Sequence, residues 1–292
     1  MDEFLRNLIV KKWKIRNFSF TFLDVLLAVC ITVTSVMLRL AVIDCTVTDW
    51  DKISAVILEF LLAVWGGILV FAYTGARIRA FLTYGVLMIY PTVIANGALW
   101  NRGSVFYAWF FLAGLYLFAK GARLRAGISV AVGTVIALFR LRISTRSLSL
   151  GWPNLYEIIG KTMFVDLFNQ VSLLVLAGLL LTGVYLGVKK RVCITRALAL
   201  QLFVFLAVLI PYLAPSMPAW AGYTADIGLL LYAMYRPEKF YLPMLHLIVS
   251  YSAYANAING TSKLPMVLYA AILLAVLMDV GRDAYREALG QA

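Results

Sequence analysis

Histidine, acidic residues and nucleotide-binding motifs are scarce or missing in this chain. It has one histidine, His246, among 292 residues, and 14 acidic residues against 26 lysines and arginines. A single histidine excludes a His-rich metal site and argues against a His-based catalytic triad. We expect His246 to form a hydrogen bond inside a helical bundle, with a proton relay as the alternative. No Walker A loop is present, which excludes the usual route to nucleotide hydrolysis.

Long apolar runs dominate what is present. A membrane-spanning helix needs roughly 20 mostly apolar residues, and lipid leaves the helix as the plausible spanning element because backbone groups must be satisfied internally. We therefore predict an all-α polytopic membrane protein with a basic N-terminal tail at 1–20, a transmembrane domain at 21–281 and a C-terminal tail at 282–292. Its ten predicted spans are 21–42, 53–74, 80–98, 105–119, 124–139, 167–187, 197–214, 219–235, 240–257 and 264–280.

The basic residues are unevenly divided between the two sides of this predicted bundle. With the N-terminus inside, 18 of the 26 lysines and arginines fall in inner segments, and Arg39 falls within the first run. The outer segments hold the other seven: Lys52, Arg102, Arg140, Arg142, Arg146, Lys161 and Lys263. By the positive-inside rule this division favours an N-in, C-in orientation. Topology thus accounts for the net charge of +12, and no nucleic-acid partner is expected.

The three cysteines fall in different environments of this topology. Cys30 lies within a run, Cys45 faces out and Cys193 faces in, so no structural disulfide is expected.

Ionisable residues inside the runs are costly in lipid, and each needs a reason. Asp24 and Arg39 lie near opposite ends of the first run, and we expect their side chains to reach the interfaces. Glu59 lies about 10 Å deep in the second run and is expected to be neutral or paired inside the bundle. Asp226 is the second carboxylate expected to be buried.

Polar residues gather on the predicted outer side, where segment 140–166 is the longest connection. A long loop among short ones favours a functional role. Arginines suit phosphate oxygens, and a carboxylate can act as a general base towards a sugar hydroxyl. Ordinary anchoring at the membrane interface is the alternative. The candidates for one outward-facing site are Asp44, Asp49, Asp51, Asn101, Arg102, Arg140, Arg142, Arg146, Asn154, Glu157, Tyr223 and Asp226.

Three stretches resemble motifs of the GT-C membrane mannosyltransferases, in the subfamily around the second mannosyltransferase of GPI-anchor synthesis and its bacterial relatives. Residues 91–118 contain Pro91, Thr92, Asn96 and Trp100 at the family's spacing. Residues 149–157, SLGWPNLYE, resemble its Ala-Pro-Asn-x-Tyr/Trp element, and residues 213–243 resemble its Leu-Pro-x-Met-His-Glu-Arg-Tyr-x-x-x-Ala-Asp segment. The resemblance covers about two thirds of the chain, in patches.

Several family positions differ in this chain. The acidic residue expected after Trp100 is absent, and Pro218 to Gly222 stand where the His-Glu-Arg core would follow Met217. Arg140 and Arg142 replace a Lys-x-Gln element, and the first outer loop is shortened to about ten residues.

The resemblance implies sugar transfer from a polyprenyl phosphate donor to an acceptor at the outer face. Asp49 would be the catalytic base, Arg102, Arg140 and Arg142 would bind the donor phosphate, and the remaining residues would contact substrate: Trp100, Asn154, Tyr156, Glu157, Tyr223 and Asp226. The altered motifs leave a second hypothesis open, in which an inactive relative binds polyprenyl lipid or partners a glycosylation enzyme. A small transporter is a third. Gly and Pro sit mostly at the ends of the runs, which disfavours it.

No cofactor is predicted, and a divalent cation is left open. The expected partners are membrane lipid, a polyprenyl phosphate sugar and, under the second hypothesis, another membrane protein. We expect the protein in a bacterial cytoplasmic membrane.

Overall fold

The computed structural model describes residues 12–15, 18–42, 50–99, 103–141, 148–159, 164–260 and 264–290. Within these residues the helices and strands comprise many helices and one short hairpin, and turns or loops connect them. Its contacts divide it into two compact units, Met1–Asn101 and Arg102–Ala292. The sequence had suggested a single transmembrane domain at 21–281.

The first unit begins with an antiparallel hairpin in the segment expected to be a tail. Strands β1 (Lys12–Ile15) and β2 (Phe18–Thr21) pair with Lys12 opposite Thr21. Helix α2 (Phe22–Val42) follows directly. Asp24 accepts hydrogen bonds from the Thr21 amide at 2.7 Å and the Thr21 hydroxyl at 2.9 Å, so the start of the helix is capped by a reciprocal pair of side chains.

Helix α3 (Trp50–Thr74) packs against a helix that is broken in the middle. The broken helix comprises α4 (Arg77–Ile89), α5 (Pro91–Ile94) and the π-helix η1 (Ala95–Leu99), with a bend of 47° between its two parts. Pro91 explains the break because the residue before a proline avoids the α conformation, and Tyr90 is extended. The π-helix η1 packs against both α2 and α3.

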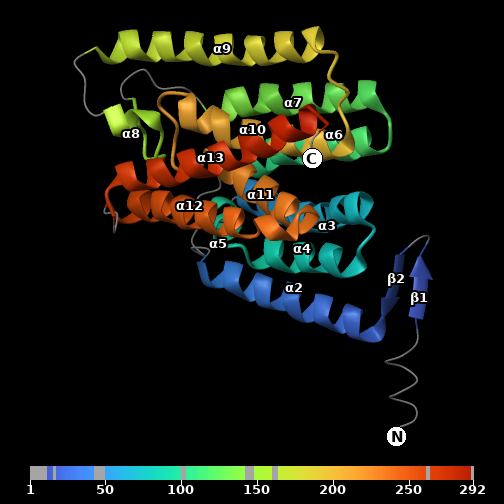
Figure 1. The fold of residues 1–292 in the computed structure, drawn as a ribbon. Coiled ribbons are helices and arrows are strands. Elements are labelled where there is room, and N and C mark those ends of the chain that lie inside the picture. Colours follow the sequence, from blue (N-terminus) through green and yellow to red (C-terminus); the bar gives the residue numbers. More distant parts are fainter. Residues whose placement is uncertain are drawn as a thin grey trace, which may run out of the picture. The chain divides into compact units, whose positions relative to one another are not determined.

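The second unit is built around α11, in which every residue from Tyr223 to Met234 is buried. Figure 1 shows its helices, whose bounds are α6 Ser104–Ala119, α7 Arg123–Leu141, α8 Leu155–Ile159, α9 Val165–Lys189, α10 Arg196–Leu213, α11 Tyr223–Tyr235, η2 Pro237–Lys239, α12 Tyr241–Asn259 and α13 Met266–Ala288. Helices α6, α10 and α12 pack against α11, and α13 packs against α10 and α12. In contrast, α9 buries only Asn169, Ser172 and Leu176 among the described residues, so its exposed apolar side chains suit contact with lipid.

Local sequence explains where several helices begin and end. The Thr195 hydroxyl accepts a hydrogen bond from the Leu198 amide at 3.0 Å and caps α10. Gly260 ends α12 at φ +70°, a left-handed conformation that glycine adopts without a steric penalty.

Each of the ten predicted runs contains helix, but in the described part of the chain fewer than ten helices are long and apolar enough to cross a membrane. In the described part of the chain four meet this requirement: Phe22–Ala41, Val56–Thr74, Val165–Lys189 and Arg196–Leu213. The bent pair Arg77–Ile89 and Pro91–Ala98 makes a fifth if it is one span. Ser104–Ala119 is apolar but shorter. The chain is therefore a helical membrane protein, with fewer spans by this measure than the ten expected.

Candidate functional site

Segments 148–159 and 213–223, which overlap the motif-like stretches 149–157 and 213–243, pack against each other in the second unit. The Ser216 amide donates to the Leu148 carbonyl at 2.9 Å, and the Trp152 amide donates to the Met217 carbonyl at 3.3 Å. Isolated β-bridges join Leu150 and Gly151 to Pro218. Segments far apart in sequence thus form one ordered layer at the start of α11.

Asn154 and Tyr156 hold this layer together. The fully buried Asn154 donates to the Leu148 carbonyl at 3.0 Å, and its side-chain oxygen accepts from the Tyr156 amide at 3.1 Å. The Tyr156 hydroxyl donates to the Leu213 carbonyl at 2.7 Å. Both side chains therefore hold the main chain of the two segments in position. Their assignment as substrate-binding residues stays a prediction.

Of the other predicted residues, Glu157 lies in this layer, Arg140 lies outside it, and four fall outside the described residues. Glu157 accepts a hydrogen bond from the hydroxyl of Ser149. Arg140 is exposed in the last turn of α7, with its guanidinium 5.3 Å from the centre of the Phe106 ring. No contact in the described part of the chain joins Arg140 to Asn154 or Asp226. The residues outside the described ranges are Asp49, Trp100, Arg102 and Arg142.

Beneath the layer, Asp226 forms a buried polar cluster with two residues of α12. One carboxylate oxygen lies 2.7 Å from His246 Nδ1, and the other accepts from the Ser250 hydroxyl at 2.7 Å. All three side chains are fully buried. Asp226 is thus buried as predicted, and His246 makes the expected hydrogen bond inside the bundle. We call the pair the Asp226–His246 dyad.

Trp152 links the layer to this dyad. Its ring centre is 5.7 Å from that of His246, and its side chain is 1% exposed. Gly222 allows this position because a Cβ there would overlap the indole ring. Tyr223, the neighbouring candidate residue, is also fully buried. Trp152 Nε1 and His246 Nε2 are both buried and have no hydrogen-bond partner among the described residues.

Neither Trp152 nor Ser250 was predicted from the sequence to belong to this cluster. His246 and Ser250 are four residues apart, and this spacing places them on one face of a helix. That spacing was the available signal. The partnership with Asp226 depends on how α11 packs against α12, which the spacing does not indicate.

The first unit contains a buried ion pair, which corrects the expectation that Arg39 reaches the interface. Arg39 and Glu59 are each 1% exposed, and their closest charged atoms are 3.1 Å apart. Arg39 also donates to the Met88 carbonyl at 2.9 Å and to the hydroxyl of Ser35. A charge is cheaper inside a bundle when it is paired, and the broken helix supplies the free carbonyl. The expectation that Glu59 is paired is confirmed.

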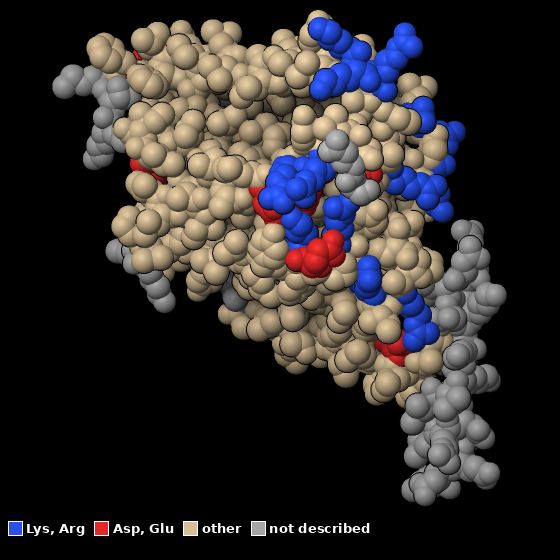
Figure 2. Space-filling model, viewed as in Figure 1, with Lys and Arg blue, Asp and Glu red and all other residues tan. Residues whose placement is uncertain are grey.

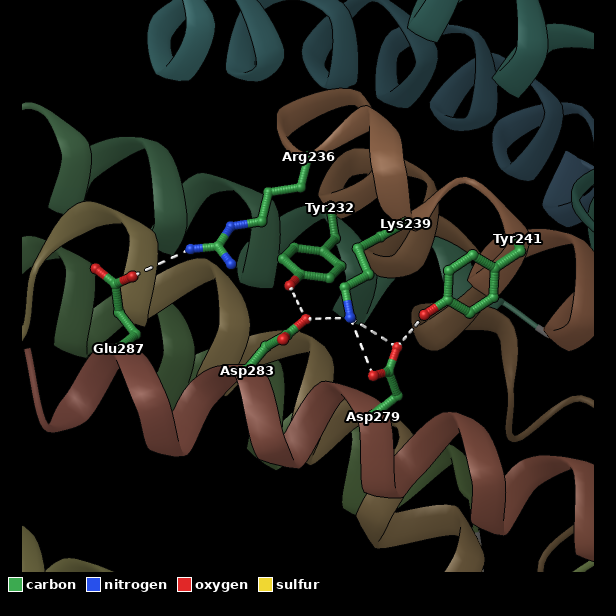
Figure 3. Close-up of polar contacts among 7 residues, drawn as sticks. All are labelled: Tyr232, Arg236, Lys239, Tyr241, Asp279, Asp283 and Glu287. Carbon is green, nitrogen blue, oxygen red and sulfur yellow. Dashed lines mark hydrogen bonds and ion pairs between the residues drawn. The ribbon is translucent and has the colours of Figure 1, made fainter. Parts of the chain in front are cut away.

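A second charged cluster joins η2 and α12 to α13 in the second unit (Figure 3). The Lys239 ammonium lies 2.8 Å from Asp279 and 2.9 Å from Asp283. The hydroxyls of Tyr232 and Tyr241 donate to Asp283 and Asp279, respectively. Partial burial lowers the pKa of Lys239, but the hydrogen bonds and charges of the two carboxylates outweigh this effect and raise the pKa well above its ordinary value.

The same end of the second unit carries many exposed cations. Glu287 contacts Arg236 at 3.3 Å and accepts from the Thr195 hydroxyl at 3.1 Å, so the start of α10 and the ends of α11 and α13 meet there. Figure 2 shows blue side chains towards the right of the view, where Figure 1 places ends of α6, α7 and α9 and the C-terminus. Exposed cations of these helix ends are Lys120, Arg123, Arg125, Lys189, Lys190, Arg191, Arg196, Arg282 and Arg286.

No protein-family model, curated protein or solved structure was found to match this chain. In the described part of the chain, no group of three or more His, Cys, Asp or Glu side chains is arranged to hold a metal ion.

Proposed function

We propose that this protein is a GT-C-type glycosyltransferase, or a descendant of one, that binds a polyprenyl phosphate sugar at the outer face of a bacterial cytoplasmic membrane. The proposed topology has ten spans and both termini inside. The meeting of α10, α11 and α13 at one cation-rich end of the second unit supports this orientation, because anionic lipid and the positive-inside rule both favour cations on the inner side.

The observation that carries the proposal is the contact between segments 148–159 and 213–223. These segments contain all or part of two of the three motif-like stretches, and they are joined by main-chain hydrogen bonds. Trp152 of this layer contacts His246, the partner of the buried Asp226 carboxylate. A shared ancestral site explains why segments with separate family-like motifs form one layer.

In the active form of this proposal, Asp49 removes the proton of the acceptor hydroxyl. The acceptor oxygen then bonds to the sugar C1 as the bond from C1 to the donor phosphate breaks. Arg102, Arg140 and Arg142 bind the phosphate that leaves with the polyprenyl chain, because guanidinium groups match phosphate oxygens.

An inactive lipid-binding descendant, alone or as a partner of a glycosylation enzyme, is the second candidate. The side chains of Asn154 and Tyr156 favour this candidate, because their polar groups already form hydrogen bonds with main-chain groups of the protein.

Transfer of labelled sugar from polyprenyl phosphate mannose tests the proposal. The wild-type protein in liposomes is compared with Asp49→Asn and with Asp44→Asn, a matched change in the same predicted loop. We expect saturable donor binding in all three and turnover that is lost in Asp49→Asn alone. Donor binding without wild-type turnover supports the inactive descendant, and absence of donor binding refutes both.

A further inference from the structure

Two ring nitrogens are buried without partners among the described residues, on neighbouring rings where the layer meets the dyad. Indole nitrogen is a hydrogen-bond donor only, and it normally finds an acceptor when it is buried. Imidazole presents one nitrogen as donor and the other as acceptor when it is neutral. Trp152 Nε1 and His246 Nε2 have no partner among the described residues, and their ring centres are 5.7 Å apart.

Asp226 determines what His246 can offer. A carboxylate 2.7 Å from Nδ1 favours a proton on that nitrogen, so neutral His246 keeps Nε2 as an acceptor. The Ser250 hydroxyl, 2.7 Å from the other carboxylate oxygen, holds Asp226 in this orientation. The pair of rings thus combines one acceptor, Nε2, with one donor, Nε1–H.

A hydroxyl group matches this combination, since it can donate to His246 Nε2 while it accepts from Trp152 Nε1–H. A carboxylate or phosphate oxygen has no proton to donate, and an ammonium has no lone pair to accept. We propose that Trp152 and His246 form a subsite for one hydroxyl of the sugar carried by the donor lipid.

The subsite rests on the proposed function, because it assumes that a sugar-bearing lipid reaches the second unit. Both side chains are covered, at 1% and 0% exposure, so a hydroxyl enters as the ring of Trp152 shifts. The Trp152 amide has a long main-chain hydrogen bond to Met217, at 3.3 Å. Leu150, close to Trp152 in the same segment, is 45% exposed, which places this segment at the surface of the unit.

Two substitutions remove one hydrogen-bonding atom each and keep most of the packing. His246→Asn keeps an amide that can donate a hydrogen bond to Asp226 but removes Nε2. Trp152→Phe fills most of the volume of the indole ring but removes its N–H. Ser252→Ala, on the same helix, is the control because its hydroxyl donates to the Ile248 carbonyl of that helix at 2.7 Å.

The experiment measures the Kd of the purified, full-length protein in nanodiscs for polyprenyl phosphate mannose and for bare polyprenyl phosphate. For each of His246→Asn and Trp152→Phe we expect the Kd of the sugar lipid to rise about fivefold to tenfold, as for one lost hydrogen bond. The Kd of the bare lipid should not change, and Ser252→Ala should match wild type for both lipids.

The outcomes separate this inference from the function on which it rests. If wild type binds neither lipid, the proposed function fails. If wild type prefers the sugar lipid and both variants keep that preference, the subsite is refuted. Should a variant fail to fold, donor lipids with single deoxy sugars test wild type directly: one missing hydroxyl must weaken binding by the same factor, and equal binding of all deoxy forms overturns the subsite.

Discussion

Arg39 and Glu59 form the contact of the first unit that should be most sensitive to single substitutions. Removing one partner leaves a buried charge without compensation, and we expect Arg39→Met or Glu59→Gln to lower the free energy of unfolding by about 3–5 kcal/mol. The pair of Arg77 and Asp24 is a matched comparison at 2.7 Å, with side chains 31% and 26% exposed. Its loss should cost less than about 1 kcal/mol.

Chemical or thermal unfolding of each variant in detergent measures this difference. The double variant Arg39→Met with Glu59→Leu should recover most of the lost stability, because an apolar pair removes the cost of a buried charge. Equal losses of stability on breaking the buried pair and the partly exposed pair would contradict the assignment of Arg39 to the interior.

Gly97 of the π-helix is a second residue where one methyl group matters. A Cβ at this position would overlap the Glu59 carboxylate. We expect Gly97→Ala to lower stability by about 1–3 kcal/mol, the usual cost of overpacking a tightly packed interior. Gly127→Ala is the control, since a Cβ there meets nothing within 4 Å. The midpoints of thermal unfolding should fall for the first variant and stay the same or rise for the second.

The cluster around Lys239 links helical elements, and its loss should loosen the end of α13. Lys239→Met removes a cation shared by Asp279 and Asp283, and we expect a loss of about 1.5–3 kcal/mol, as for hydrogen bonds to charged groups. Arg236→Met removes a single contact of 3.3 Å and should cost less. Hydrogen exchange in the last turns of α13 should rise more in the first variant than in the second.

The pH dependence of this effect follows from the raised pKa of Lys239. A raised pKa means that the stabilising charge is fully present below the ordinary lysine value, about 10.4, and is lost as pH rises through the higher folded value. The difference in unfolding free energy between wild type and Lys239→Met should therefore be constant from about pH 6 to pH 9. A difference that shrinks across this range would contradict the assigned charge state.

The sequence predicted the helices well and their mutual contacts poorly. Apolar runs identified the long helices because burial in lipid imposes that pattern, but they did not identify the short helix α8. The run at 80–98 was taken as one span, although Pro91 breaks it. Helix α11 begins at Tyr223 and not at 219, because the preceding residues form turns that pack against segment 148–159.

In the candidate site, too, burial could be predicted from the sequence, but the contacts between helices could not. Burial of Asp226 and Glu59 followed from their depth in apolar runs, which is a local property. Their partners His246 and Arg39 come from neighbouring helices, and the sequence carries no signal for which helices lie together. Trp152 was missed for this reason, since its role arises from contact with α12.

At the scale of the whole molecule, the number of spans decides the location of both ends of the second unit. With ten spans and the N-terminus inside, Lys120, between α6 and α7, and Arg286, near the end of α13, lie inside. If only the four long helices and the bent pair cross the membrane, both positions lie outside. Both side chains are exposed, so cysteines placed there can react with a thiol reagent.

Labelling of single-cysteine variants with a membrane-impermeant maleimide distinguishes the two topologies. The three native cysteines are replaced by serine, and Lys120→Cys and Arg286→Cys are introduced separately. Ten spans predict labelling of both positions only after the membrane is permeabilised. Retaining native Cys45 or native Cys193 alone gives the controls, because Cys45 is predicted to be outside, whereas Cys193 is inside in both topologies. Labelling of Lys120→Cys and Arg286→Cys in intact cells would overturn the ten-span arrangement, in which the cation-rich end of the second unit faces inside.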